Sequence, residues 1–478
     1  MATSCPGRTF PLPAVGVRIP DIVIPPVLKA FKSLSTIGAF MLSYHRETGT
    51  EETVRSSGNP LRGHTGTTIT EYISKALEYS REYSHPACIE ADHVSVTASP
   101  EVAIKRIAAG GHSLEPISRN EADASLSYVE AELREASKAG GLDIVTIDTC
   151  DLIDHRVDHM EPGDVEAIYE ERVGEDARAL ESVYGGGKFR VLSGGRLIEL
   201  KLGREELVRL AAKYWLSLEY AERVYRLASE VLGKPFLLEV AFDETPRPTE
   251  PVELAFYLSE LARRGVYPDY IAPNIGFEKR EDYRGRLEDL RETLSKLSAI
   301  AWSMGSMLSI HSGSGHNPYS DKGPLVWETV REATGGLVKY KVSGVYIQLL
   351  LEVMSRFPKG SKPRRLYEEI YDYVLKTVER YVKERSGLYS KGLEEMVRRY
   401  REASRPYDPR ADFFRHYFFL FQAAVDAEGR RWLREEVLQL YLSDWELRRE
   451  YEREAYMLTS RLVKKLGLEG NLSFVTGG

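Results

Sequence analysis

Acid and histidine side chains that suit proton transfer or metal binding occur at two places in the sequence. Asp92 stands beside His93 at the end of an apolar run in EADHV (90–94), and His311 ends a later run in SIHSGSGHN (309–317). An aspartate can accept a proton, and histidine is the commonest metal ligand in proteins. One acid–histidine pair is usually structural, but the second motif strengthens a catalytic interpretation of the first.

Small residues follow His311 and form a loop that could receive an anion. Ser312, Ser314 and His316 belong to this loop, together with two glycines. Small side chains let backbone N–H groups come close to a phosphate or carboxylate. We expect Ser312, Ser314 and His316 to contact the substrate.

An acid inside an apolar run is the third chemical signal. Glu239 lies in LLEVAF, where an unpaired carboxylate would be costly, so we expect it to be protonated, ion-paired or bound to a metal. The structural alternative is a salt bridge with a lysine or arginine of the barrel. Asp243 follows this run and Asp148 follows an earlier one, and both are candidate substrate contacts. For Asp243 we favour a capping or supporting role over a catalytic one.

Two lysines fall on one face of a late apolar run. Lys339 and Lys341 are two residues apart in LVKYKVSG, so both point to the same side of a strand. One face of a barrel strand points inward, which predicts two interior lysines that contact the substrate. A surface pair and a Schiff-base lysine are the alternatives.

Short apolar β-branched runs that alternate with longer amphipathic stretches position these motifs. Alternation of this kind predicts parallel strands joined by crossover helices. Eight strands close a barrel, so we predict a (β/α)8 TIM-type barrel, with an open doubly wound sheet as the alternative. The polar motifs then share the rim at the carboxyl ends of the strands. The predicted strands are 15–19, 39–44, 87–94, 144–147, 236–242, 270–273, 307–311 and 337–342, and helices include 100–109, 126–139, 205–232, 251–264 and 287–304.

Two segments do not follow this alternation of strands and helices. Residues 184–202 are flanked by glycines and predict a hairpin inserted after the fourth strand. Residues 362–466 are helical in pattern, with Leu366, Ile370, Val374, Val378 and Tyr381 on one stripe. We therefore predict a barrel over 1–355 and a helical extension over 356–478, which caps the barrel or mediates homo-oligomer formation.

Composition limits the classes of function. The chain has 478 residues with a net charge of −7, which argues against nucleic-acid binding. No apolar run is long enough to span a membrane, and no signal peptide is evident, so we expect a cytoplasmic protein. The three cysteines, Cys5, Cys88 and Cys150, include no CxxC pair. They predict neither a disulfide framework nor a zinc knuckle, and Cys88 and Cys150 are expected to be small buried hydrophobes.

In their order along residues 15 to 350, the motifs resemble the tagaturonate epimerase family, which interconverts D-tagaturonate and D-fructuronate. The resemblance rests on the ADH strand end, TIDxxD (146–151), ExxxDETxxPTxP (239–251), the IHSGS loop (310–314) and ATGGL-x3-K (333–341). It implies a divalent-metal barrel related in plan to class II aldolases.

The resemblance also implies roles for four residues. Asp92 would be the proton acceptor, His93 and His311 metal ligands, and Glu239 the proton donor. The carbon that is inverted lies β to a ketone, so α-proton abstraction cannot invert it; transient oxidation or retro-aldol cleavage is required. No GxGxxG motif follows a strand, which disfavours nicotinamide and favours retro-aldol chemistry with a Lewis acid.

Two positions depart from the family pattern. Lys339 stands where a histidine is expected, and SGSGHN replaces SGSDK, which offers His316 as a substitute ligand. The leading hypothesis is a metal-dependent epimerase of a sugar acid or ketose, with Zn, Mn, Ni or Co equally suited to mixed N/O ligands. The alternatives are an aldolase or lyase at the same site and a barrel that only binds sugar or assembles with a partner.

Overall fold

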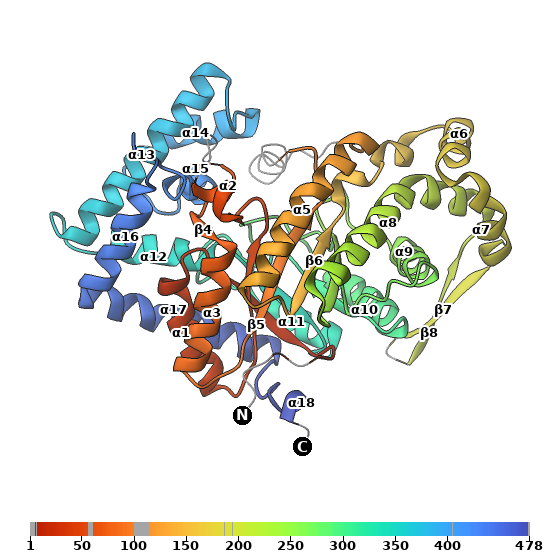
Figure 1. Cartoon of the computed structure of the whole chain (residues 1–478), viewed down its shortest axis with the longest axis horizontal. Coiled ribbons are helices and arrows are strands. Elements are labelled where there is room, and N and C mark those ends of the chain that lie inside the picture. The colour runs from red at the N-terminus through yellow and green to blue at the C-terminus, as the bar shows by residue number, and fades with distance from the viewer. Residues whose placement is uncertain are drawn as a thin grey trace.

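Eight parallel strands form a closed barrel at the centre of the molecule (Figure 1). The computed structural model describes residues 5, 7–55, 61–99, 114–185, 187–193, 195–403 and 405–476. The strand order around the barrel is β1-β12-β11-β10-β9-β6-β5-β2. The predicted barrel is therefore confirmed. Its strands are β1 (Leu12–Gly16), β2 (Ala39–Ser43), β5 (Cys88–Ser95), β6 (Ile144–Asp148), β9 (Leu237–Phe242), β10 (Tyr270–Pro273), β11 (Met307–Ile310) and β12 (Lys339–Val342).

All eight predicted strands exist, and the first differs most in its bounds. It ends at Gly16 because the chain turns at once into α1, whose N-cap is Ile19 and whose first residue is Pro20. Proline is favoured there because its missing N–H is not needed in the first turn. Arg18, which we had assigned to the strand, therefore lies at the rim of the barrel.

A helix follows each barrel strand before the next one begins. These helices are α1 (Pro20–Ser33), α3 (Ile69–Glu82), α5 (Arg119–Ala139), α8 (Arg204–Leu232), α9 (Pro251–Arg263), α10 (Leu287–Ser303), α11 (Val326–Thr334) and α12 (Val345–Ser355). The helix predicted over 100–109 lies outside the described residues. Among the helices of the described residues, none combines the length and apolarity needed to cross a membrane.

Two of the connections between a barrel strand and its helix contain additional short helices and strands. Between β2 and α3 lie β3 (Thr48–Gly49), α2 (Glu51–Arg55) and β4 (Thr67–Thr68). Between β6 and α8 lie η1 (Cys150–Leu152), η2 (His155–His159), α6 (Pro162–Val173), η3 (Gly174–Asp176), α7 (Ala177–Tyr184), β7 (Lys188–Ser193) and β8 (Arg196–Lys201). Strands β7 and β8 pair in antiparallel fashion, which confirms the predicted hairpin.

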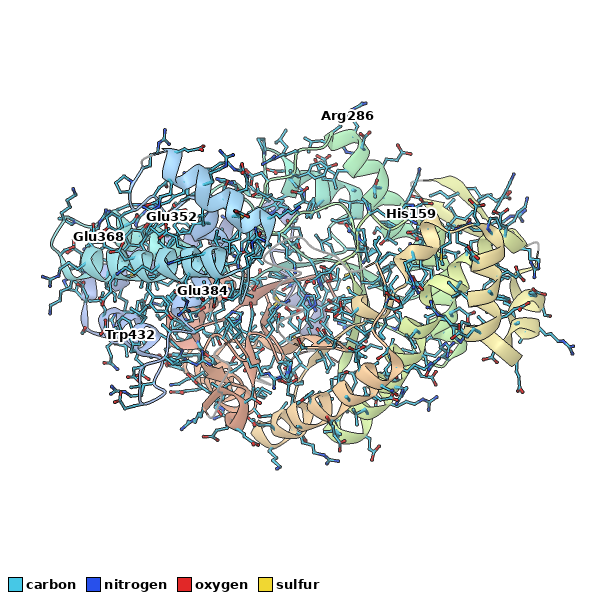
Figure 2. The ribbon with its side chains drawn as sticks, turned by 90° about the horizontal axis from the view of Figure 1, so that it is seen from above. His159, Arg286, Glu352, Glu368, Glu384 and Trp432 are labelled. Atoms are coloured by element: carbon cyan, nitrogen blue, oxygen red, sulfur yellow. A yellow bond between two sulfur atoms is a disulfide. The ribbon has the colours of Figure 1, made fainter. Side chains whose placement is uncertain are left out.

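Of the remaining helices, those within residues 362–443 gather at one end of the molecule, opposite the hairpin, whereas the last one lies beside the two chain ends (Figure 1). Figure 2 places Glu368 and Trp432 at this end and His159 toward the other. The predicted stripe is buried at Leu366, Ile370 and Val374. The helices are α13 (Lys362–Glu384), α14 (Lys391–Ala403), α15 (Asp412–Tyr417), η4 (Phe418–Phe421), α16 (Trp432–Ser443), α17 (Trp445–Leu466) and α18 (Ser473–Thr476), and α17 packs against α1, α11 and α12.

The inside of the barrel changes from apolar to charged along its axis. The amino end is filled by one apolar cluster, to which Cys88, Ile144 and Leu237 contribute. Two residues further along each strand, the side chains that point the same way are Glu90, Thr146 and Glu239. The charged layer therefore lies directly beneath the rim at the carboxyl ends of the strands.

The cysteines correct one prediction. Cys5 and Cys88 form a disulfide, which ties the start of the chain to β5. The sequence contains no CxxC pair, and nothing in it indicated that residue 5 would cross to the amino end of the barrel beside β5. Cys150 is buried and forms no disulfide with another described cysteine, as we expected.

Candidate active site at the carboxyl end of the barrel

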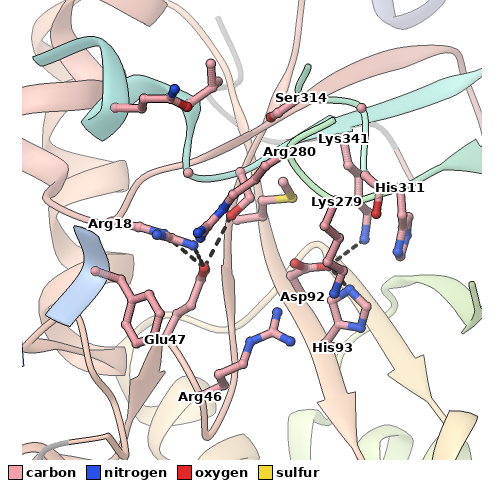
Figure 3. Close-up of a pocket in the computed structure, with 18 of the residues that line it drawn as sticks. Arg18, Arg46, Glu47, Asp92, His93, Lys279, Arg280, His311, Ser314 and Lys341 are labelled. Carbon is pink, nitrogen blue, oxygen red and sulfur yellow. Dashed lines mark hydrogen bonds and ion pairs between the residues drawn. The ribbon is translucent and has the colours of Figure 1, made fainter. Parts of the chain in front are cut away.

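A cavity opens at the carboxyl ends of the barrel strands (Figure 3). Its volume is about 930 Å³ when the space open to solvent at its mouth is included. Side chains of both the barrel and the C-terminal extension form its wall. The lining residues are Arg18, Met41, Arg46, Glu47, His64, Asp92, His93, Asp243, Lys279, Arg280, His311, Ser312, Gly313, Ser314, Lys341, Ser343, Gly344, Val345, Gln348, His416 and Phe419.

A break in the ladder of β5 turns two neighbouring residues toward this cavity. The pairing of β5 with β6 shifts in register between Ala91 and Val94. His93 adopts a left-handed backbone with φ of 47°, which is uncommon outside glycine. Successive residues of a regular strand point to opposite faces, so this irregularity explains how Asp92 and His93 both line the cavity.

The imidazole of His93 is oriented from behind by a carboxylate. Its Nδ1 lies 3.0 Å from Oδ2 of Asp148, and its Nε2 lies 3.8 Å from Oδ1 of Asp92. A carboxylate behind a histidine fixes the ring and leaves the other nitrogen to face the site. Asp148 therefore supports His93 and is not part of the cavity wall.

His311 is held between two carboxylates. Its Nε2 lies 2.6 Å from Oε1 of Glu239, and its Nδ1 lies 3.1 Å from Oδ1 of Asp243. Burial alone would lower the pKa of His311, but Asp243 and Glu239 outweigh it and raise the pKa to about 9.

Three of these side chains have the geometry of a metal site. Ligand atoms of His93, Asp243 and His311 all lie within 4.8 Å of one another. Within the described part of the chain, the buried atoms Nδ1 of His311 and Oδ1 of Asp243 make no hydrogen bond, although they face each other. A shared cation would satisfy both atoms, and two imidazoles with a carboxylate are a common donor set for divalent transition metals. The residues therefore fit a metal ion.

Glu239, Lys339 and Lys341 form a buried ionic layer under the metal-type triad. Lys339 lies 2.7 Å from Glu239 and 2.8 Å from Glu90, and Lys341 lies 2.7 Å from Glu239 and 2.6 Å from Glu90. Glu90, Glu239 and Lys339 have no exposed surface. The interior lysines are confirmed, and of the three states expected for Glu239 the ion pair is observed.

Lys341 also extends to the cavity, where it forms an ion pair with Asp92 and lowers its pKa. Its Nζ lies 2.7 Å from Oδ1 of Asp92, and Ser43 donates a hydrogen bond of 3.1 Å to Oδ2. Burial would raise the pKa of Asp92, but Lys341 and the two histidines hold it well below its usual range. Asp92 is thus an ionised carboxylate at the cavity wall.

The small-residue loop after β11 only partly meets expectation. Ser312, Gly313 and Ser314 line the cavity. Gly313 is required because a Cβ there would lie 2.5 Å from the carbonyl oxygen of Lys341. His316 does not line the cavity: its backbone N–H donates to Asp282, and its ring lies 3.8 Å from Glu281. The structure does not bring His316 to the triad.

The opposite wall of the cavity is rich in cations (Figure 3). Arg18 makes two hydrogen bonds to Glu47 there, of 3.0 and 2.5 Å. Lys279, which pairs with Glu244, lies on the side of Asp92 and His93 (Figure 3). Burial would raise the pKa of Glu47, but Arg18 and Arg46 lower it to about 2.

Sequence reasoning missed this cationic wall and the part of it that comes from the C-terminal helices. Arg18 was assigned to a strand, and Arg280 stands seven residues beyond β10, where no motif marks it. His416 and Phe419 come from α15 and η4, more than 100 residues after His311. Polar residues follow the predicted strand 39–44 directly, and that signal could have identified Arg46 and Glu47.

Comparison with known proteins gives consistent matches. A profile of the family described as tagaturonate epimerase matches residues 120–388. The tagaturonate/fructuronate epimerase of Thermotoga maritima is 31% identical over 196 residues, which are 40% of this chain and 37% of that protein. The matched region therefore spans little more than a third of that relative.

Solved structures agree in fold. The native fructuronate-tagaturonate epimerase of Cohnella laeviribosi superposes with a TM-score of 0.66 at 18% identity, over 97% of this chain and 82% of that chain. The same enzyme crystallised with one glycerol gives a TM-score of 0.66 at 19% identity, over 96% and 82%. At such identities the similarity establishes the fold.

Proposed function

Because the chain belongs to the tagaturonate epimerase family, we propose that it is a metal-dependent epimerase that interconverts tagaturonate and fructuronate. The observation that carries the proposal is the convergence of His93, Asp243 and His311 within 4.8 Å beside the ionised carboxylate of Asp92. The curated relative from Thermotoga maritima, which bears this activity in its name, supports the choice of substrates.

The reaction that we propose is retro-aldol cleavage followed by aldol addition. Asp92 accepts the proton of the hydroxyl group on the carbon β to the ketone. The bond between the α and β carbons breaks, and its electron pair stays on the ketone fragment as an enediolate, while the β carbon becomes an aldehyde. After the aldehyde turns over, the enediolate adds to its other face, and Asp92 returns the proton. No oxidant or reductant is consumed.

The metal would be held by Nε2 of His93, Nδ1 of His311 and a carboxylate oxygen of Asp243. When bound, a divalent cation supplies Lewis acidity to the oxygens that carry charge in the enediolate. We extend the predicted ligand pair to a triad because Asp243 has the buried oxygen without a hydrogen bond.

Lys341 has two tasks in this proposal. Its ammonium group keeps Asp92 ionised and oriented at 2.7 Å, and it adds positive charge beside the reacting oxygens. Ser312 and Ser314 contribute hydroxyl groups to the same wall, where they can bind the hydroxyl groups of the sugar.

We propose that Glu239 positions His311 and does not exchange protons with the substrate. Glu239 has no exposed surface and is not part of the cavity wall. Both of its oxygens are engaged, one with His311 and Lys341 and the other with Lys339. A carboxylate behind a ligating histidine fixes the orientation of the ring and increases its basicity. Lys339 belongs to the same supporting layer, so we do not count it as a substrate contact.

Carbon NMR tests the reaction directly. The purified protein, loaded with Mn or Zn, is given tagaturonate, fructuronate, tagatose and fructose in turn. We expect the epimer of the uronates to appear only with metal. Two separable fragments in place of the epimer would identify an aldolase, and no reaction of the uronates despite bound metal would contradict the proposal.

Paired variants separate metal binding from proton transfer. Asp92→Asn should retain the metal and lose at least about 100-fold in turnover, because general acid–base groups contribute roughly that much. His93→Ala should lose the metal, measured by elemental analysis, together with turnover. Metal content that is unchanged in His93→Ala would refute the ligand role, and turnover that is unchanged in Asp92→Asn would refute the proton-transfer role.

A further inference from the structure

We propose that the cationic wall of the cavity is an anion subsite that binds the carboxylate of the sugar acid, with Arg18 and His64 as its recognising residues. This inference rests on the proposed function, since it assigns the orientation of the substrate in the same cavity. The carboxylate would lie at the cationic wall, and the ketone end would lie at the triad of His93, Asp243 and His311.

Arg18 has a donor that no protein group uses. Its side chain is buried, and Nε and Nη2 both donate to Oε1 of Glu47. Nη1 is buried and has no hydrogen-bond partner among the described residues. A Cβ at position 344 would lie 3.1 Å from Nη1, so Gly344 keeps this side of the guanidinium group uncovered. A buried charged donor left without a partner is costly, and a bound anion removes that cost.

His64 supplies a second buried group without a partner. It is 4% exposed, lines the cavity, and neither ring nitrogen has a hydrogen-bond partner in the described part of the chain. Its ring packs on Phe419, with centroids 4.8 Å apart, and Arg431 donates to its carbonyl oxygen. A neutral imidazole offers one N–H and one acceptor, which suits a carboxylate oxygen and a neighbouring hydroxyl group.

The charge of the wall is not balanced by the protein. Arg280 donates to the carbonyl oxygens of Arg415 and His416, and it forms no ion pair with a carboxylate within the described ranges. Burial lowers the pKa of Arg280 to about 9, and the neighbouring charges of Arg18 and Arg415 act in the same direction. Arg46 adds a further guanidinium group, 3.8 Å from Glu244. An anion is therefore the ligand that this wall favours electrostatically.

The C-terminal extension completes the subsite. Arg415 donates a hydrogen bond to the carbonyl oxygen of Arg280 and forms an ion pair with Glu281. The barrel and the C-terminal extension are therefore in direct contact at this wall. The ring of Phe418 lies under both Arg18 and Arg280, at 5.8 and 5.2 Å. The extension thus holds the guanidinium groups in place, which assigns a role in substrate recognition to the helices that follow the barrel.

Titration calorimetry with three ligands tests the subsite without requiring turnover. The metal-loaded protein is titrated with D-fructuronate, D-fructose and D-fructose 6-phosphate. We expect fructuronate to bind at least about 10-fold more tightly than fructose, because only the uronate reaches the unused donors with a charge. Fructose 6-phosphate should bind more weakly than fructuronate, and the opposite order would overturn the assignment to a carboxylate.

Two variants assign the preference to the named residues. Arg18→Lys keeps a positive charge beside Glu47 but removes the planar guanidinium group, whose unused Nη1 is proposed to bind the anion. His64→Leu removes both ring nitrogens and replaces the ring with a side chain of similar size. Each should reduce the preference for fructuronate over fructose about 10-fold while fructose binding stays within about 2-fold. Arg226→Lys, on the exposed face of α8 where Arg226 pairs with Glu222, is the matched control and should change neither.

The outcomes separate this inference from the proposed function. A preference that persists in both variants overturns the subsite, even if the epimer forms. A preference that is lost in the variants supports the subsite, even if NMR detects no epimer. Thermal unfolding of each variant shows whether a lost preference is due to misfolding. If one variant misfolds, the preference measured in the other variant decides whether the subsite exists.

Discussion

Lys339→Met tests whether the lysine that replaces an expected histidine serves the fold or the metal. Lys339 is fully buried, with Nζ 2.7 Å from Glu239 and 2.8 Å from Glu90. Methionine has a similar length, so the substitution removes the charge and leaves little cavity. The structure predicts that stability falls and that metal content does not.

The size of the loss follows from the ion pairs that are broken. Removing one partner of a buried ion pair costs about 3–5 kcal/mol, because the carboxylates stay buried without their cation. Lys341 still contacts both Glu90 and Glu239, so we expect the lower end, about 3 kcal/mol. Removing one negative charge as well, in Lys339→Met/Glu90→Gln, should recover at least about half of this loss.

Urea unfolding at pH 7 measures the change, followed by the fluorescence of the five tryptophans. Metal stoichiometry is measured on the same folded samples. A loss below about 1 kcal/mol for the single variant, or no recovery in the double variant, would contradict the ionic layer. A folded variant without metal would show instead that Lys339 supports the metal site.

Three further predictions follow from other parts of the structure. Reducing the disulfide between Cys5 and Cys88, whose positions are 83 residues apart, should destabilise the fold by up to about 4–5 kcal/mol in calorimetry, and Cys5→Ala should abolish this sensitivity to reductant. Glu47 has a pKa of about 2 in the fold, below its ordinary value, so its contribution of about 3 kcal/mol is complete above pH 4.5 and is lost as the pH falls toward 2; Glu47→Gln should lack this loss in urea titrations at pH 7 and pH 3. Gly313→Ala forces a Cβ onto the backbone of β12 and should cost about 1–3 kcal/mol in thermal unfolding, whereas Gly163→Ala, in open space, should not destabilise.

The barrel could be predicted because its signal is local. Each strand is a short apolar run followed by an amphipathic helix, and eight repetitions of that pattern leave few arrangements. The hairpin was equally visible because glycines flank it. Bounds were less certain: α1 begins at Pro20, and the helix signal of that proline competed with the apolar run before it.

The residues of the site could be predicted only where they stand at the end of a recognisable strand. Asp92, His93 and His311 end their strands, so the barrel brings them to one rim. Arg18, His64 and Arg280 meet only because loops and C-terminal helices fold over that rim. Such contacts join residues that are far apart in sequence, and no period or short motif records them. The disulfide was missed for the same reason.

The replacement of an expected histidine by Lys339 can be understood from its depth in the barrel. Side chains that point inward from one strand occur at every second residue, so positions 339 and 341 differ by one layer, roughly 6.6 Å. Lys341 stands at the level of Asp92 and contacts it, whereas Lys339 stands a layer lower, where it pairs with Glu90 and Glu239 and lies 5.0 Å from the ring centroid of Tyr270. The members of the triad come from the ends of β5 and β11 and from the loop after β9, where Asp243 lies. A change at position 339 therefore alters the charge beneath the triad without removing one of its members.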